Sequence, residues 1–141
     1  MLRLAQSTNC LLLGSLLSAL ACGGVGQTGS VEIVEPAEAA LVTGPEVRIL
    51  LAAHGVEIAP ASDEREGTAH HHLFVDRDVT PLGDTIPSGV TGILHLGRGQ
   101  TEFLLQGLGA GEHTVIAVLA DRAHMPLDPP ASDTVHFTVG P

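Results

Sequence analysis

The chain has 141 residues, which suffices for one domain with a single modest core, and its formal net charge is −10. Its six basic residues are all arginines and form no basic patch, so we expect no nucleic-acid partner. With 2% aromatic residues and neither Trp nor Tyr, the chain also lacks the stacking platforms of proteins that bind carbohydrate or single-stranded nucleic acid.

The first 21 residues have the pattern of a secretory signal peptide. Arg3 is followed by the apolar stretch 11–17 and then by small residues, and the stretch is shorter than a membrane-spanning helix requires. We therefore assign residues 1–21 to a leader that is removed, and we expect the mature protein to be exported.

Cys22 follows this leader directly. The sequence Ala19-Leu20-Ala21-Cys22, continued by Gly23, resembles the cleavage site of bacterial lipoproteins, in which the cysteine thiol is acylated and becomes the new amino terminus. The resemblance implies a lipid anchor, and a glycine after the cysteine favours the outer membrane, facing the periplasm or the cell surface. Ordinary signal cleavage beside an incidental cysteine is the alternative.

Both cysteines of the chain, Cys10 and Cys22, lie in this N-terminal part. The folded part therefore has no disulfide and no thiol, so a metal site there must use nitrogen and oxygen ligands. Residues 22–30 are rich in glycine and are expected to form a flexible tether to the membrane, with a reach of about 15 Å.

Residues 31–141 are expected to form one β domain. Short apolar runs rich in β-branched residues are separated by Gly and Pro, and no long stretch has helical periodicity. The predicted strands are Val31–Val34, Val47–Ala53, Ala69–Val75, Ile93–Leu96, Thr101–Leu105, His113–Ala120 and Thr134–Val139. About seven strands with turns between them predict an all-β fold, an antiparallel two-sheet sandwich of immunoglobulin-like type.

The eight histidines of the chain fall mostly within and beside these short apolar runs. A β-strand sends alternate side chains to the same face, so His70 and His72 point together at a spacing of about 6.5–7 Å while Leu73 and Val75 point the other way. Two imidazoles this close can hold one metal ion, or they can brace each other through hydrogen bonds.

His95 is expected on the same face as this pair. In the strand 93–96 it points away from Leu94 and Leu96, which would join Leu73 in the core. The outer face of the sheet would then carry three imidazoles from two strands.

Two further histidines are candidates to complete a metal site: His124, in the loop after the strand 113–120, and His113, at the start of that strand. Zn²⁺ and Cu²⁺ accept imidazole nitrogens at about 2.0–2.1 Å, so copper or zinc is the expected ion. Asp121 is a candidate acceptor for the second ring nitrogen of a ligand, which would orient that imidazole.

A purely structural role for these histidines is the alternative. A buried neutral imidazole that is hydrogen-bonded on both nitrogens needs no metal, and His and Asp side chains at strand ends often bind loop backbones. We expect His54, His71 and His136 to be surface or packing residues.

The segment Gly97-Arg98-Gly99-Gln100 allows a tight turn with a close backbone approach. Arg98 together with Gln100 would suit an anionic ligand such as a carboxylate, and an ordinary hairpin turn is the alternative.

Enzymatic function is not expected. The chain has no cysteine in its folded part, no G-x-S-x-G segment and no H-E-x-x-H helix. A water activated by a metal on three histidines is the one catalytic route left open.

Several longer motifs occur in a specific order and spacing. They include H-H-H-L-F-V-D from His70, H-L-G-R-G-Q-T-E from His95 and D-R-A-H-M-P-L-D-P-P from Asp121. In these motifs, and over nearly the whole mature chain, the sequence resembles the bacterial family catalogued as domain of unknown function 4399. The resemblance implies an exported, compact β-sandwich and brings no established activity. Members of the family usually carry further histidines where this chain has Leu127 and Ile93.

Two hypotheses from different classes follow. The first is a non-enzymatic, membrane-anchored envelope lipoprotein domain that serves as a structural or protein-interaction module, with a protein partner in the envelope. The second is a module that binds or buffers copper or zinc through His70, His72 and His95.

Overall fold

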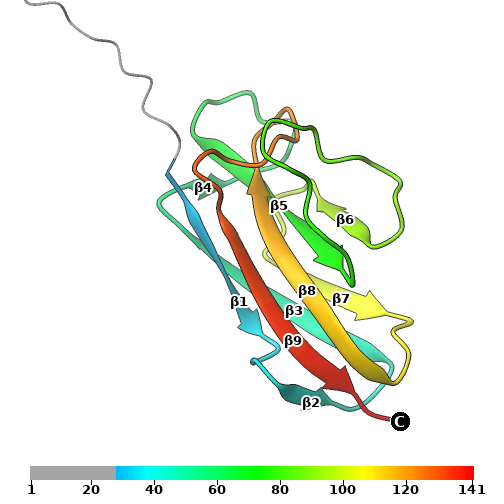
Figure 1. Cartoon of the computed structure of the whole chain (residues 1–141). Helices are drawn as coiled ribbons and strands as arrows, with labels where there is room; N and C mark the ends of the chain where they lie inside the picture. Colours follow the sequence, from blue (N-terminus) through cyan, green and yellow to red (C-terminus); the bar gives the residue numbers. More distant parts are fainter. Residues whose placement is uncertain (1–27) are drawn as a thin grey trace, which may run out of the picture.

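The computed structural model describes residues 28–141 (Figure 1), so the predicted leader and Cys22 lie outside the described residues. Within that range the regular structure is entirely β, and there is no helix long and apolar enough to cross a membrane. The strands are β1 (Ser30–Glu35), β2 (Ala40–Val42), β3 (Glu46–His54), β4 (Glu57–Ile58), β5 (Thr68–Val75), β6 (Ile93–Leu96), β7 (Glu102–Gln106), β8 (Gly111–Ala120) and β9 (Ser132–Val139).

The strands form two sheets that enclose one apolar core. The smaller sheet has the order β1-β3-β7, and the larger has the order β2-β9-β8-β5-β4 with β6 paired to β5. In Figure 1 the long strands β8 and β9 run side by side, and β3 passes behind them. The core contains Val31, Ile33, Val47, Ile49, Leu51 and Leu105 from the smaller sheet, and Ala69, Leu73, Leu96, Val115, Ala117, Leu119, Val135, Phe137 and Val139 from the larger one.

All of the strands predicted from the sequence occur, and their ends differ from the prediction by at most two residues. The predicted number of about seven was too low, because β2 and β4 are only three and two residues long. Runs this short do not contain enough residues for a recognisable alternation of apolar and polar positions. The prediction of a purely antiparallel fold was also wrong, since β2 pairs parallel to β9 and β4 pairs parallel to β5.

Strand β5 is buried on both of its faces. Ala69 and Leu73 point into the core between the sheets, while Phe74 lies on the outer face of the larger sheet. This outer face is not open to solvent there, because the long connection from β5 to β6 folds back and packs Ile86 against Phe74 and Val118. The result is a small second apolar cluster outside the sheet, directly beside the histidines of β5.

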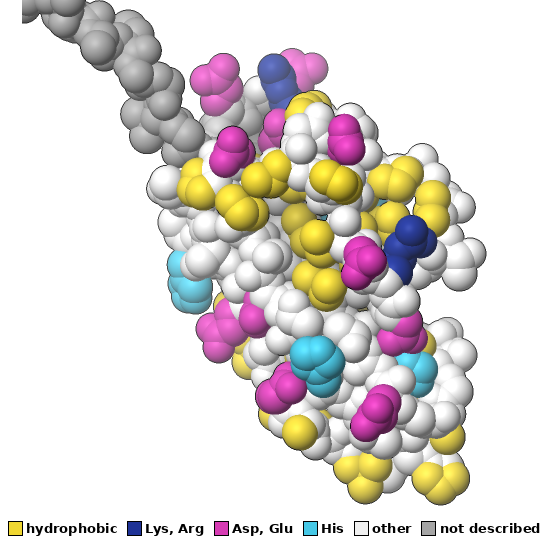
Figure 2. Space-filling model, in the orientation of Figure 1, with side chains coloured by type: hydrophobic (Ala, Val, Ile, Leu, Met, Phe, Trp, Pro, Cys, Tyr) yellow, Lys and Arg dark blue, Asp and Glu magenta, His cyan; other side chains and the backbone are white. Residues whose placement is uncertain are grey.

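Acidic side chains are spread over the molecular face drawn in Figure 2, and basic side chains on it are few. This distribution agrees with the net charge of −10. The surface field therefore attracts cations and repels anions over distances of about a Debye length.

An ion pair joins the end of β5 to the start of β8. Asp76, at φ 52°, accepts a 2.9 Å hydrogen bond from the backbone N–H of Thr114 and lies 2.8 Å from Nδ1 of His113. Nε2 of His113 lies 2.8 Å from the carbonyl oxygen of Gly109, so both ring nitrogens face acceptors. Only the doubly protonated imidazolium donates to both. The hydrogen bonds to Asp76 and Gly109 accordingly raise the pKa of His113.

We expect this pair to stabilise the fold at mildly acidic pH and to lose its effect as the pH rises. Because folding raises the pKa of His113 above its ordinary 6.5, its contribution is complete below that value and disappears as the pH passes through the folded-state pKa. Urea unfolding of the full chain at about pH 6 and about pH 8 measures the effect. Wild type should lose more stability over this interval than His113→Gln, and equal losses would contradict the assignment.

Candidate metal centre

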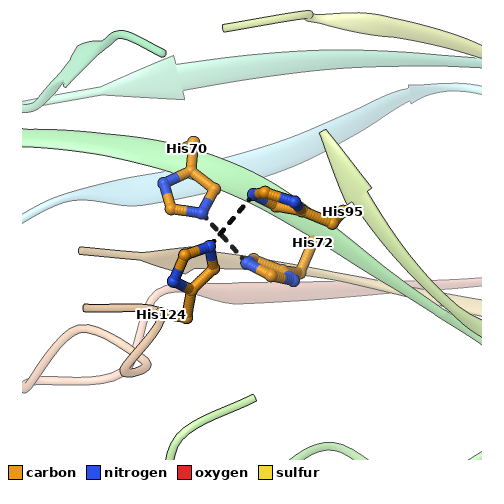
Figure 3. Close-up of side chains that lie close together, drawn as sticks. All are labelled: His70, His72, His95 and His124. Atoms are coloured by element: carbon orange, nitrogen blue, oxygen red, sulfur yellow. Dashed lines mark hydrogen bonds between the residues drawn. The ribbon is translucent and has the colours of Figure 1, made fainter. Parts of the chain in front are cut away.

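Four histidines from three separate segments converge at one point beside the larger sheet. His70 and His72 come from β5, His95 comes from β6, and His124 comes from the turn after β8. One ring nitrogen from each lies within 4.8 Å of the corresponding nitrogen of every other. Figure 3 shows the four imidazoles directed toward a common centre.

Strand alternation and register explain why β5 and β6 contribute three of these side chains. His70 and His72 share the outer face of β5, and His72 is directly opposite His95 in the antiparallel β5–β6 pair. Leu94 and Leu96 pack in the core, as predicted, so His95 points outward.

A tight turn delivers the fourth imidazole. His70 is opposite Ala120, the last residue of β8, so the turn that follows β8 starts beside it. Oδ1 of Asp121 accepts hydrogen bonds from the backbone N–H groups of Ala123 and Met125, at 2.8 and 3.0 Å. His124 lies within this turn at φ 60°, a left-handed conformation that aims its side chain back over β5.

The imidazoles contact one another in two close pairs. Nε2 of His72 lies 3.1 Å from Nε2 of His70, and Nε2 of His124 lies 3.2 Å from Nε2 of His95. In each pair one ring donates a proton and the other accepts it, which requires at least one neutral imidazole. The spacing is close to the ~3.3 Å that separates two nitrogens bound tetrahedrally to one ion at about 2.0–2.1 Å.

Burial lowers the pKa of three of the four imidazoles. His70 is 1% exposed and His72 is 2% exposed. Burial, reinforced by the imidazoles of His95 and His124, lowers the pKa of His70 to about 4. Burial and the imidazoles of its neighbours, led by His70, lower the pKa of His72 to about 3, and partial burial together with His124 also lowers the pKa of His95. Neutral imidazoles are the form that binds metal.

One buried polar atom of the cluster has no partner. Nδ1 of His72 is inaccessible to solvent and makes no hydrogen bond with any described residue. An unpaired buried nitrogen costs about 1–3 kcal/mol of stability. Nε2 is the nitrogen of His72 that faces the other imidazoles, so this cost falls on the opposite side of the ring.

Gly97 makes room for His95. A Cβ atom on Gly97 would overlap Cε1 and Nε2 of the His95 imidazole, so only glycine lets this ring lie across the backbone. The sequence does not predict this role for Gly97. The G-R-G motif at residues 97–99 is visible, but two glycines so spaced are usual in ordinary turns.

The other predicted site residues lie elsewhere or have another role. His113 does not join the cluster, because it lies near the start of β8 whereas His70 is opposite the last residue of that strand; there Asp76 and Gly109 engage both of its ring nitrogens. Asp121 shapes the turn through backbone N–H groups and acts on His70 only through its charge, which raises the pKa of that ring.

In the predicted ligand turn, Gly97–Gln100, a side chain hydrogen-bonds to the backbone of the turn itself. Oε1 of Gln100 accepts a 2.7 Å hydrogen bond from the backbone N–H of Arg98, around Gly99 at φ 76°. The amide oxygen of Gln100 therefore serves the turn, as in the hairpin alternative.

The remaining histidines are surface or packing residues, as expected. His54 and His136 are exposed, and His136 pairs with Glu38. His71 is fully buried, and its Nδ1 lies 3.1 Å from the carbonyl oxygen of Gln100.

The two positions at which the family resemblance implies further histidines are apolar here. Leu127 is buried in the core, and Ile93 packs on the outer cluster. The convergence of the four imidazoles does not depend on either position.

Substitution of Gly97 by alanine should expel His95 from the cluster without disturbing the fold. The backbone of Gly97 does not require a positive φ, and His95 is exposed, so the ring can swing outward. Away from its neighbours, the pKa of His95 should rise toward its ordinary value, which an NMR titration of the histidine rings measures.

Gly109→Ala is the matched control, because a Cβ atom at Gly109 would contact nothing. An unchanged titration of His95 in Gly97→Ala would show that Gly97 does not set the position of the ring.

Comparison with known proteins gives a family match and two solved structures of low similarity. No curated protein matches the chain. Among solved structures it is similar to an engineered protein of a structural genomics consortium, at 14% identity and a TM-score of 0.49, covering 81% of this chain and 20% of that one. It is also similar to the extracellular domain of BT4673 from B. thetaiotaomicron, at 9% identity and a TM-score of 0.45, covering 79% of this chain and 15% of that one.

The chain thus spans a fifth or less of the length of those structures. Residues 49–140, which include all four clustered histidines, match the family described as Domain of unknown function (DUF4399). The chain belongs to this family.

Proposed function

We propose that this protein binds a transition metal ion, copper or zinc, through His70, His72, His95 and His124. The observation that carries the proposal is the convergence of four ring nitrogens within 4.8 Å of one another. Imidazole nitrogen is a favoured ligand of both ions, and three or four such ligands are the usual number in protein sites.

The energetics of the cluster favour this function over a structural role. Two of the imidazoles are almost fully buried, and burial strongly lowers their pKa values. Apolar side chains of similar volume would fill the same space without the desolvation of polar nitrogens. A bound ion supplies the compensation, because each lone pair directed at the centre would then make a coordinate bond.

We propose binding or buffering of the ion rather than catalysis. Catalytic zinc sites usually have three protein ligands and a water, whereas sites that only hold the ion have four protein ligands. The four clustered imidazoles fit the second class.

The metal-stripped full chain should bind Cu²⁺ or Zn²⁺ with a Kd below about 1 μM. Calorimetric titration at neutral pH measures the affinity and the stoichiometry, which should be one ion per chain. His95→Ala should weaken binding at least about tenfold, because it removes one ligand. His95 is exposed, so its loss should leave the fold intact.

His54→Ala is the control, since His54 is an exposed histidine outside the cluster. Equal affinities for His95→Ala and His54→Ala would place any bound ion elsewhere. Absence of binding to wild type would overturn the proposal and leave the structural or protein-interaction module, with an envelope partner, as the function of this domain.

We further propose that the protein is an exported lipoprotein anchored in the bacterial outer membrane through Cys22. The support is the leader 1–21, the small residues before Cys22 and the glycines after it. An anchor would hold the metal centre within reach of the membrane surface.

The lipid anchor makes a simple prediction. Expression of the full chain in a bacterium fed with labelled palmitate should yield a labelled protein that fractionates with the outer membrane. Cys22→Ser should be unlabelled and should be released into the soluble fraction, because the thiol that is acylated is missing. Labelling of Cys22→Ser would refute acylation at this residue.

The scaffold beneath the site fits an immunoglobulin-like sandwich, and we infer that arrangement. Its support is the strand order: β1-β3-β7 corresponds to A-B-E of such a domain, and β9-β8-β5 corresponds to G-F-C.

A further inference from the structure

A cavity of about 400 Å³ adjoins the histidine cluster. His72, His95 and His124 form one side of it, and the connection between β5 and β6 forms the other. His95 is exposed, so the cavity is open to solvent. Three of the four candidate ligands therefore border free space as well as the cluster centre.

The four ligands leave the charge of a divalent ion unbalanced. All are imidazoles, which bring no negative charge to a bound ion, and the described ligand group contains no carboxylate. The charge of Asp121 acts on His70, but its Oδ1 is already engaged by the backbone of its own turn. A site with a net charge of +2 and two nearly buried ligands is costly, because burial removes the water that would screen it.

We propose that the bound ion takes a small anion, an inorganic anion or a carboxylate, as an additional ligand in this cavity. This inference rests on the proposed metal site. The anion lowers the net charge of the centre, and the cavity supplies the position from which it reaches the ion. Zinc and copper both accept a fifth ligand.

The cavity wall suits a small anion with one polar end. Ile86 and Ile93 make part of it apolar, which strengthens the attraction between the anion and the metal ion. Thr85 and Ser88 bring hydroxyl groups that donate hydrogen bonds to the distal atoms of the anion. Elsewhere the acidic surface repels anions, so this position is distinguished from non-specific binding.

The test uses azide on the Cu²⁺-loaded full chain, after excess copper has been removed by dialysis. Azide bound to Cu²⁺ gives a charge-transfer absorption that free azide lacks. We expect a saturable band at one azide per copper. Acetate should compete with azide, whereas acetamide, its neutral counterpart, should not.

Ile93→Phe tests the cavity itself, because the larger ring would occupy the space beside His95. It should weaken azide binding at least about tenfold while leaving the copper affinity within about twofold. Leu104→Phe, on the exposed side of β7, is the matched control and should match wild type. Ser88→Leu narrows the same cavity from the opposite wall and serves if Ile93→Phe fails to fold.

Copper content is measured before azide is added, which separates the two proposals. Chain that binds no copper refutes the metal site and, with it, the anion position. Chain that holds one copper but gives no azide band refutes the anion position alone. Azide affinity that is unchanged in both cavity variants, or equal competition by acetate and acetamide, also overturns the proposal.

Discussion

The double burial of β5 is the constraint on which the rest of the structure depends. A strand in a two-sheet fold normally has one face in the core and one in water, and imidazoles on the outer face would then be solvated. Here the connection from β5 to β6 returns across the outer face, and the backbone N–H of Ile86 donates a 2.8 Å hydrogen bond to the carbonyl oxygen of His124. The same segment thus lies across the cavity from His72 and fixes the turn that carries the fourth imidazole.

Sequence periodicity was sufficient for seven of the nine described strands and for three of the four clustered histidines. Alternation along β5 predicts that His70 and His72 share a face, and the leucines that flank His95 place it on that face too, because both arguments need only the local strand geometry. The choice between His113 and His124 could not be made in this way. It depends on which end of β8 lies beside His70, and that is a matter of strand register.

The role of Gly97 and the packing of the connection between β5 and β6 could not be predicted from the sequence, for a different reason. Both act through contacts between segments that are distant in the chain or through space left empty, and neither leaves a periodic pattern. The contacts of Asp121 and Gln100 depend on local turn geometry in the same way. A side-chain oxygen near a turn can serve a ligand or the turn's own backbone, and only the coordinates distinguish these uses.

The ligands of the centre come from segments that are far apart in sequence. His95 and His124, whose Nε2 atoms are 3.2 Å apart, are separated by 29 positions along the chain. An ion held by both would act as a reversible cross-link, closing the intervening chain into a loop and restricting the unfolded ensemble in the manner of a disulfide. A domain without thiols in its folded part would in this way have a cross-link in place of a disulfide. The stability that this cross-link adds would increase with the concentration of free metal ion.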